Sequence, residues 1–212
     1  MNKILFLDTL TTGLSPERCA IYRMGGIFCE MTATSIREMQ RIDLRIRPNE
    51  KARISDSSLW IGGETRRTLV AFPDQKETFD TFIKTLDGVV NVKNPKDKLY
   101  VASFNASSFD VPFLRNWFQM NDNGRFRDYF YVQTLDLMSL AAFALINERE
   151  GMPDFHMETT AKYLGVNVEH TEKYDCISNA EMYIEMYKAL ETRLKTGDNM
   201  FYEKTENIYR NF

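Results

Sequence analysis

The sequence predicts an α/β domain whose mixed central sheet is flanked by helices. Strand-like apolar segments come first, at residues 4–7, 20–30 and 41–47, and short turns separate them. This arrangement predicts an antiparallel meander of three strands. A further strand-like run at residues 99–104 lies among segments of helical periodicity. Strands first and interleaved helices later are typical of an α/β domain with a mixed sheet.

The segment after the meander changes from irregular to helical. Pro48 ends the third strand, and residues 49–68 are polar enough that we expect an irregular connection. From Pro73 onward, apolar residues recur at the spacing of one helical face. We expect Gly88 to end this helix.

The middle of the chain combines the strand at residues 99–104 with a second helix. Ser107 or Ser108 is placed to cap that helix, because serine oxygens accept hydrogen bonds from the free amides of a helix start. The apolar residues of this helix recur three or four positions apart on one face: Phe109, Phe113, Trp117 and Met120. Another helical run is expected over residues 135–146.

The C-terminal third is predicted to be helical. A short helix over residues 158–164 is closed by Gly165, and a long helix follows. The long helix carries a single apolar stripe: Tyr183, Met186, Tyr187, Leu190 and Leu194. We assign residues 1–195 to one domain and expect residues 196–212 to form an aromatic arm that packs on it.

Composition narrows the class of protein. The 212 residues are 43% hydrophobic and 27% charged, which suits one globular domain with a substantial core. The net charge of −3 argues against coating nucleic acid by bulk electrostatics. The longest apolar run, residues 140–146, is too short to cross a bilayer, and three scattered cysteines suggest no disulfide framework. We therefore expect a soluble, cytoplasmic protein with no membrane partner.

Three aspartates occupy positions where strands end or helices begin: Asp8, Asp110 and Asp175. In α/β folds such positions converge on one edge of the sheet, so these carboxylates can share a site. An aspartate near a helix start is more often a cap than a catalyst. Position alone therefore leaves both roles open.

Three ordered motifs add weight to a shared site. They are LDTLTTGL at residues 7–14, FNASSFDVPFL at residues 104–114 and HTEKYD at residues 170–175. Together they resemble the DEDD exonuclease superfamily, in the histidine-bearing branch called DEDDh. The tyrosine-bearing branch would place a tyrosine at position 171, where this chain has Thr171. The resemblance implies a ribonuclease-H-like fold and metal-dependent 3′ to 5′ exonuclease activity.

The resemblance also implies a role for each motif residue. Asp8, Asp110 and Asp175 would hold two Mg²⁺ or Mn²⁺ ions, and hard cations of this kind prefer carboxylate oxygens. His170 would act as general base toward the attacking water. Such a site can activate water and stabilise the charge that develops during phosphodiester hydrolysis.

Position 10 departs from the family pattern. The first motif of the family reads Asp-x-Glu, whereas this chain has Leu10 two residues after Asp8, on the same face of the strand. Leucine offers no ligand atom, so we expect metal affinity to fall by orders of magnitude. Three explanations stay open: an engineered inactivating change, natural loss of catalysis, or an enzyme with an altered metal site.

Candidate substrate-binding residues lie next to the motif residues. Leu14 and Phe109 could stack on bases, and Asn105 could bind a terminal phosphate or sugar. Core packing is the alternative for Phe109, and helix capping is the alternative for Asn105. The expected partner is the 3′ end of a single strand, and the sequence does not distinguish DNA from RNA.

Three functions follow from these observations. The leading hypothesis is a 3′ to 5′ exonuclease that releases nucleoside monophosphates and is weakened by Leu10. A second is a catalytically silent nucleic-acid-binding module that protects or recruits 3′ ends. A third is an enzyme of the same fold that degrades very short oligonucleotides.

Overall fold

The computed structural model describes residues 2–32, 35–168 and 174–196. The predictions for His170, and for the aromatic arm beyond residue 196, concern residues outside this description. Within the described ranges, no helix combines the length and the apolar character that a membrane span requires.

The centre of the molecule is a mixed five-stranded sheet in the order β3-β2-β1-β4-β5. The strands are β1 (Asn2–Thr11), β2 (Ile21–Met31), β3 (Ile36–Arg45), β4 (Leu99–Ser103) and β5 (Leu135–Asp136). β1, β2 and β3 pair antiparallel, whereas β4 runs parallel to β1, and β5 runs parallel to β4. The predicted meander and mixed sheet are confirmed, although β3 begins five residues before the expected position 41.

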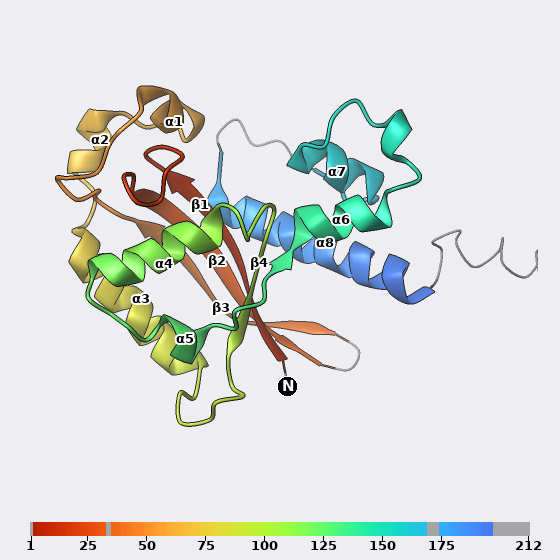
Figure 1. Ribbon diagram of the computed structural model, residues 1–212, viewed down its shortest axis with the longest axis horizontal. Helices are drawn as coiled ribbons and strands as arrows, with labels where there is room; N and C mark the ends of the chain where they lie inside the picture. The colour runs from red at the N-terminus through yellow and green to blue at the C-terminus, as the bar shows by residue number, and fades with distance from the viewer. Residues whose placement is uncertain (1, 33–34, 169–173, 197–212) are drawn as a thin grey trace, which may run out of the picture.

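Helices cover both faces of this sheet (Figure 1). On one face lie α3 (Gln75–Val89), α4 (Asp110–Met120) and α5 (Phe126–Tyr129), and on the other lie α6 (Leu137–Ala144), α7 (Met157–Tyr163) and α8 (Cys176–Thr196). Two short helices, α1 (Asp56–Ile61) and α2 (Arg66–Val70), lie beyond the end of β1 (Figure 1). A 3₁₀ turn spans Arg149–Gly151.

Alternation along β1 distributes its side chains between the two layers. Leu5 and Leu7 belong to the core under α3 and α4, whereas Ile4 and Phe6 belong to the core under α6 and α8. The same alternation continues to the end of the strand. Asp8 therefore faces α8, and Thr9 faces α4.

The expected irregular connection over residues 49–68 is wrong, because α1 and α2 form within it and just after it. Each helix is a single short amphipathic turn that buries one leucine, Leu59 or Leu69, in a cluster with Leu10. Helices this short have little periodicity to detect, and tertiary burial stabilises them.

Three further boundaries differ from expectation. α3 continues through Gly88 to Val89. The run expected as helix over residues 135–146 opens as β5, and Asp136 then caps α6 by accepting hydrogen bonds from the amides of Met138 and Ser139. Neither predicted serine caps α4, whose N-cap is Phe109. Ser107 instead donates its hydroxyl to Asp136 at 2.6 Å.

Candidate functional site

The three predicted aspartates lie at one end of the sheet. Asp8 is near the end of β1, Asp110 opens α4 directly after the β4 connection, and Asp175 immediately precedes α8. Asp8 and Asp110 are buried, with 4% and 3% of their surfaces exposed. Asp175 is partly exposed.

Asp8 is held by donors that α8 and the residue before Asp175 supply. The hydroxyls of Tyr183 and Tyr174 donate to its Oδ1 at 2.8 and 3.2 Å, and the amide of Asn179 donates to Oδ2 at 3.2 Å. Burial raises the pKa of Asp8, and these hydrogen bonds oppose that rise. Burial also raises the pKa of both phenols well above the usual value, so they remain donors.

Asp110 is enclosed by two hydroxyls. Thr9 donates to Oδ1 at 2.7 Å, and Ser103 donates to Oδ2 at 2.6 Å. Burial and the nearby charge of Asp8 raise the pKa of Asp110 to about 7, while the two hydroxyl hydrogen bonds lower it. A carboxylate with this pKa is protonated in a large fraction of molecules at neutral pH.

Asp175 is bound by an arginine and by the start of its own helix. Arg23 of β2 donates to Oδ1 at 2.7 Å, and the amide and hydroxyl of Ser178 donate to Oδ2 at 3.0 and 2.8 Å. Burial acts to raise the pKa of Asp175, but the hydrogen bonds of Ser178 and the charge of Arg23 outweigh it and lower the pKa. This carboxylate is therefore ionised and neutralised by a protein cation.

Leu10 lies inside an apolar cluster. Its side chain is 5% exposed and packs with residues from β2, α1, α2, the turn after α2 and the start of α8: Tyr22, Leu59, Leu69, Phe72 and Cys176. Gly62, the residue that ends α1, comes so close that a Cβ there would lie 2.8 Å from Leu10 Cδ1. Position 10 is thus a core position of this fold, covered by α1 and α2.

These residues do not fit the two-metal site that the family resemblance implies. Every carboxylate oxygen of Asp8, Asp110 and Asp175 already accepts a hydrogen bond from the protein. Leu10 offers no oxygen, and Arg23 places a positive charge beside Asp175. In the part of the chain that the structure describes, no three acidic, histidine or cysteine side chains gather in a geometry that could bind a metal.

The candidate substrate-binding residues differ in their surroundings. Leu14 is 84% exposed in the loop after β1, where it is free to contact a ligand. Phe109 is half-buried and packs on Phe113, with their ring centroids 5.1 Å apart. Asn105 adopts a left-handed backbone conformation (φ 71°), and its carbonyl accepts the amides of Ser108 and Phe109. Asparagine tolerates this conformation better than most residues.

The donors around the carboxylates are not evident from the sequence. In the sequence Tyr183 is part of the apolar stripe of the last helix, whereas in the structure its hydroxyl donates a hydrogen bond to Asp8. Arg23 pairs with Leu10 across β1 and β2, a register that brings its guanidinium to Asp175. Thr9 and Ser103 could have been predicted to lie near the carboxylates. They are polar residues at the ends of adjacent parallel strands, and such residues face the same sheet edge.

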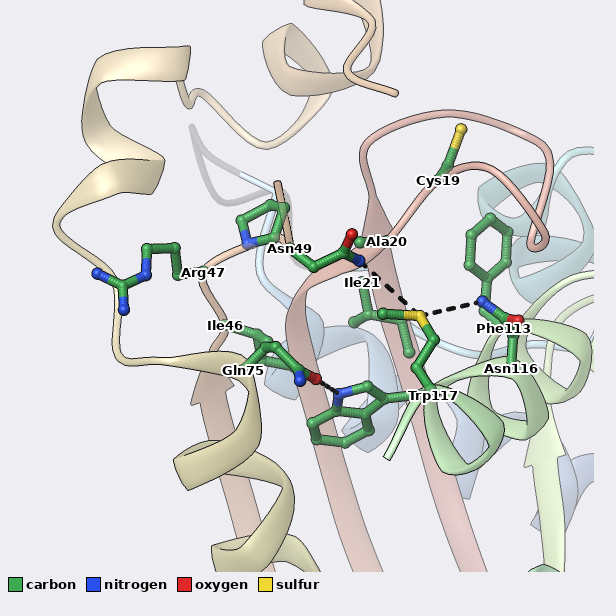
Figure 2. Close-up of a pocket in the computed structure, with 12 residues that line it drawn as sticks. Cys19, Ala20, Ile21, Ile46, Arg47, Asn49, Gln75, Phe113, Asn116 and Trp117 are labelled. Atoms are coloured by element: carbon green, nitrogen blue, oxygen red, sulfur yellow. Dashed lines mark hydrogen bonds between the residues drawn. The ribbon is translucent and has the colours of Figure 1, made fainter. Parts of the chain in front are cut away.

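A second feature near the sheet is a narrow crevice between the β1–β2 loop and α4 (Figure 2). Figure 2 shows Gln75 and Trp117 joined by a hydrogen bond, which measures 3.1 Å. The Met120 sulfur accepts from Asn116 at 3.3 Å. The crevice holds only about 10 Å³, the space of roughly one water, so it is a packing feature and not a ligand site.

Comparison with known proteins extends these observations. The family model of the RNase_H superfamily matches residues 57–202. Escherichia coli exonuclease I in complex with a dT13 oligonucleotide is 22% identical, with a TM-score of 0.71 over 95% of this chain and 44% of that one. A product-bound structure of exonuclease I is 21% identical, with a TM-score of 0.70 over 92% of this chain and 45% of that one. The chain spans less than half the length of these structures.

No curated protein sequence matches the chain. The structural likeness confirms the predicted ribonuclease-H-like fold. The family model covers more than half of the sequence, from α1 past the end of α8. The chain therefore belongs to the RNase_H superfamily.

Proposed function

We propose that this protein binds the 3′ ends of single-stranded nucleic acid and that metal-dependent hydrolysis is lost or strongly weakened in it. The observation that carries the proposal is that every oxygen of the three carboxylates accepts a hydrogen bond from the protein, while Arg23 pairs with Asp175 and position 10 has no ligand atom. Membership of the RNase_H superfamily supports a nucleic-acid substrate. The similarity to exonuclease I, which is seen in complex with dT13 and dA16 oligonucleotides, supports a single strand.

A metal ion would have to displace protein donors from these carboxylates. An ion at Asp8 would compete with Tyr183, Tyr174 and Asn179, and each buried donor left unpaired costs about 1–3 kcal/mol. An ion near Asp175 would also meet the guanidinium of Arg23. Without a carboxylate at position 10, the site has less ligand charge to offset these costs.

A metal-dependent 3′ to 5′ exonuclease of the DEDDh type is the second candidate. Its support is the proximity of Asp8 and Asp110, close enough for the charge of one to raise the pKa of the other. In this alternative Mg²⁺ or Mn²⁺ would bind Asp8, Asp110 and Asp175, and His170 would serve as general base. The products would be nucleoside monophosphates.

One experiment separates the two candidates. A single strand of about 12 nucleotides, labelled at its 5′ end and made as DNA or RNA, is titrated with the protein in EDTA and followed by fluorescence anisotropy. The same strand is then incubated with millimolar Mg²⁺ or Mn²⁺ and analysed on a sequencing gel. We expect binding in EDTA, preference for a free 3′ end over a 3′-blocked one, and no shortening.

Progressive shortening from the 3′ end with wild-type protein would establish the exonuclease instead. Absence of binding to both strands, with or without metal, would contradict both candidates. Asp8→Asn serves as the matched control for a shortening activity, since a contaminating nuclease would survive that substitution.

A further inference from the structure

A hollow on the outer side of α4 has no role among the contacts described above. It has a volume of about 370 Å³ and lies between the loop after β1, the exposed side of α4 and the segment before β5. Val111, which follows Asp110 directly, lines its wall. The hollow therefore lies at the start of α4, the helix that Asp110 opens, and its lining includes none of the three aspartates.

One side chain in this hollow lacks the partners that its chemistry requires. The Nε of Arg115 is buried and has no hydrogen-bond partner. Within the described residues, no carboxylate pairs with the Arg115 guanidinium and no acceptor binds it. Buried donors in folded proteins are nearly always satisfied, so this N–H calls for an acceptor that the described residues do not supply.

The guanidinium of Arg115 also packs on an aromatic ring. Its central carbon lies 5.0 Å from the ring centroid of Phe126, the first residue of α5. Stacking on an aromatic ring covers one face of the guanidinium, and within the described residues its two terminal nitrogens make no hydrogen bond. An arginine edge matches the paired oxygens of a phosphate, to which it can donate two parallel hydrogen bonds.

The rest of the lining suits a phosphate joined to a sugar. Thr134 and Asn116 add polar groups, and Asn116 already donates its amide to the carbonyl of Pro16 at 2.6 Å. Val111 adds an apolar wall. The opposing charge is Glu17, which is exposed in solvent and accepts a hydrogen bond from Ser15 at 2.9 Å. Water screens this carboxylate more than it screens the half-buried arginine.

The geometry points to a subsite for a phosphodiester group of the bound strand, with Arg115 as the residue that binds the phosphate. This inference rests on the proposed function, because it places a contact of the same strand beside the carboxylate site. Backbone contacts of this kind position a strand without reading its sequence. Affinity should therefore depend on Arg115 equally for different base compositions.

The test measures how tightly wild type and three variants bind a 5′-labelled oligothymidylate of about 12 nucleotides in EDTA over a range of salt concentrations. The variants are Arg115→Gln, Arg115→Lys and the control Lys84→Gln, which removes a positive charge from the exposed side of α3. We expect Arg115→Gln to bind about tenfold more weakly and to flatten the salt dependence by about 0.7 in log–log slope. The affinity of Arg115→Lys should lie between those of wild type and Arg115→Gln. Lysine keeps the positive charge but cannot donate the two parallel hydrogen bonds of a guanidinium.

The outcomes separate this inference from the proposed function. Binding by Arg115→Gln with wild-type affinity and slope would overturn the subsite and leave strand binding intact. If wild type binds no strand, the subsite is tested separately. Thymidine 5′-monophosphate is titrated into the wild-type protein, and the amide NMR signals of Ser107 and Thr134 are followed. Shifts that vanish in Arg115→Gln would support a phosphate site on its own, and the absence of shifts in wild type would overturn it. Arg115→Lys provides the same comparison if the glutamine variant does not fold.

Discussion

Arg23 donates a 2.7 Å hydrogen bond to Asp175, and this ion pair lies where the family resemblance implies a metal ion. The two residues are 152 positions apart in the sequence. β2 supplies the arginine from the position opposite Leu10, and the start of α8 supplies the aspartate. A protein cation thus neutralises a carboxylate that the sequence motif assigns to metal binding.

Replacing Arg23 with glutamine should destabilise the fold by about 1 kcal/mol at neutral pH, because Asp175 and the more exposed Asp43 both lose their charged partner. The pKa of Asp175 is lowered in the folded state, so the stability it contributes is present above its ordinary value of 3.8 and is lost as pH falls through the folded pKa. Urea unfolding at about pH 7 and about pH 3 tests this. The difference between wild type and variant should shrink at the lower pH.

The control for this prediction is Arg37→Gln, which breaks the more exposed pair with Glu30 on β2 and β3. Exposed ion pairs contribute little to folding stability, so Arg37→Gln should change the free energy of unfolding by close to zero. Equal destabilisation by both substitutions would contradict a special role for Arg23.

Leu10→Glu should destabilise the protein by more than about 3 kcal/mol and should not restore nuclease activity. The reason is that position 10 lies in the apolar cluster with Leu59 and Leu69, where a carboxylate would be desolvated and would compete with Asp175 for Arg23, its neighbour across β1 and β2. Leu10→Met keeps the volume and apolar character and should cost less than about 1.5 kcal/mol. Chemical denaturation measures both, and metal-dependent strand shortening by a stable Leu10→Glu protein would refute the core assignment.

Asp110→Asn should raise stability above neutral pH and flatten its pH dependence. The folded pKa of about 7 exceeds the ordinary value of 3.8, so the folded state binds the proton more tightly. Asp110 therefore makes its full contribution to folding stability below about pH 4, and this contribution declines as the pH rises toward 7. Thermal unfolding across this range should show a decline in wild type that the variant lacks.

Asp122→Asn provides the matched control, because Asp122 is exposed beyond the far end of α4. This variant should keep the wild-type pH profile. A decline that persists in Asp110→Asn would show that another group is responsible.

Tyr183→Phe should cost about 1–3 kcal/mol, since it removes the shortest hydrogen bond to the buried Asp8. Tyr187→Phe is the comparison one helical turn later, where the ring packs on Phe6 at 5.8 Å and no hydroxyl hydrogen bond is found among the described residues. The second substitution should be nearly neutral. Similar losses for both, measured by urea unfolding, would mean that the Asp8 network adds little stability.

The sequence alone determined the main layers of this fold. Period-two alternation in β1 separates Leu5 and Leu7 from Ile4 and Phe6, and this pattern is local enough to read directly. The three motifs likewise predicted the superfamily and the sheet edge at which Asp8, Asp110 and Asp175 lie. Local periodicity and motif order require no knowledge of distant partners.

Only the tertiary structure decided what surrounds those carboxylates. Tyr183 reaches Asp8 across 175 positions, and α1 and α2 cover Leu10 although their own helical signal is weak. Whether an aspartate binds a metal ion or a protein donor depends on the groups that the folded chain places against its oxygens. Those groups come from elements far apart in sequence, and the packing of α8 and β2 against β1 is what brings them together.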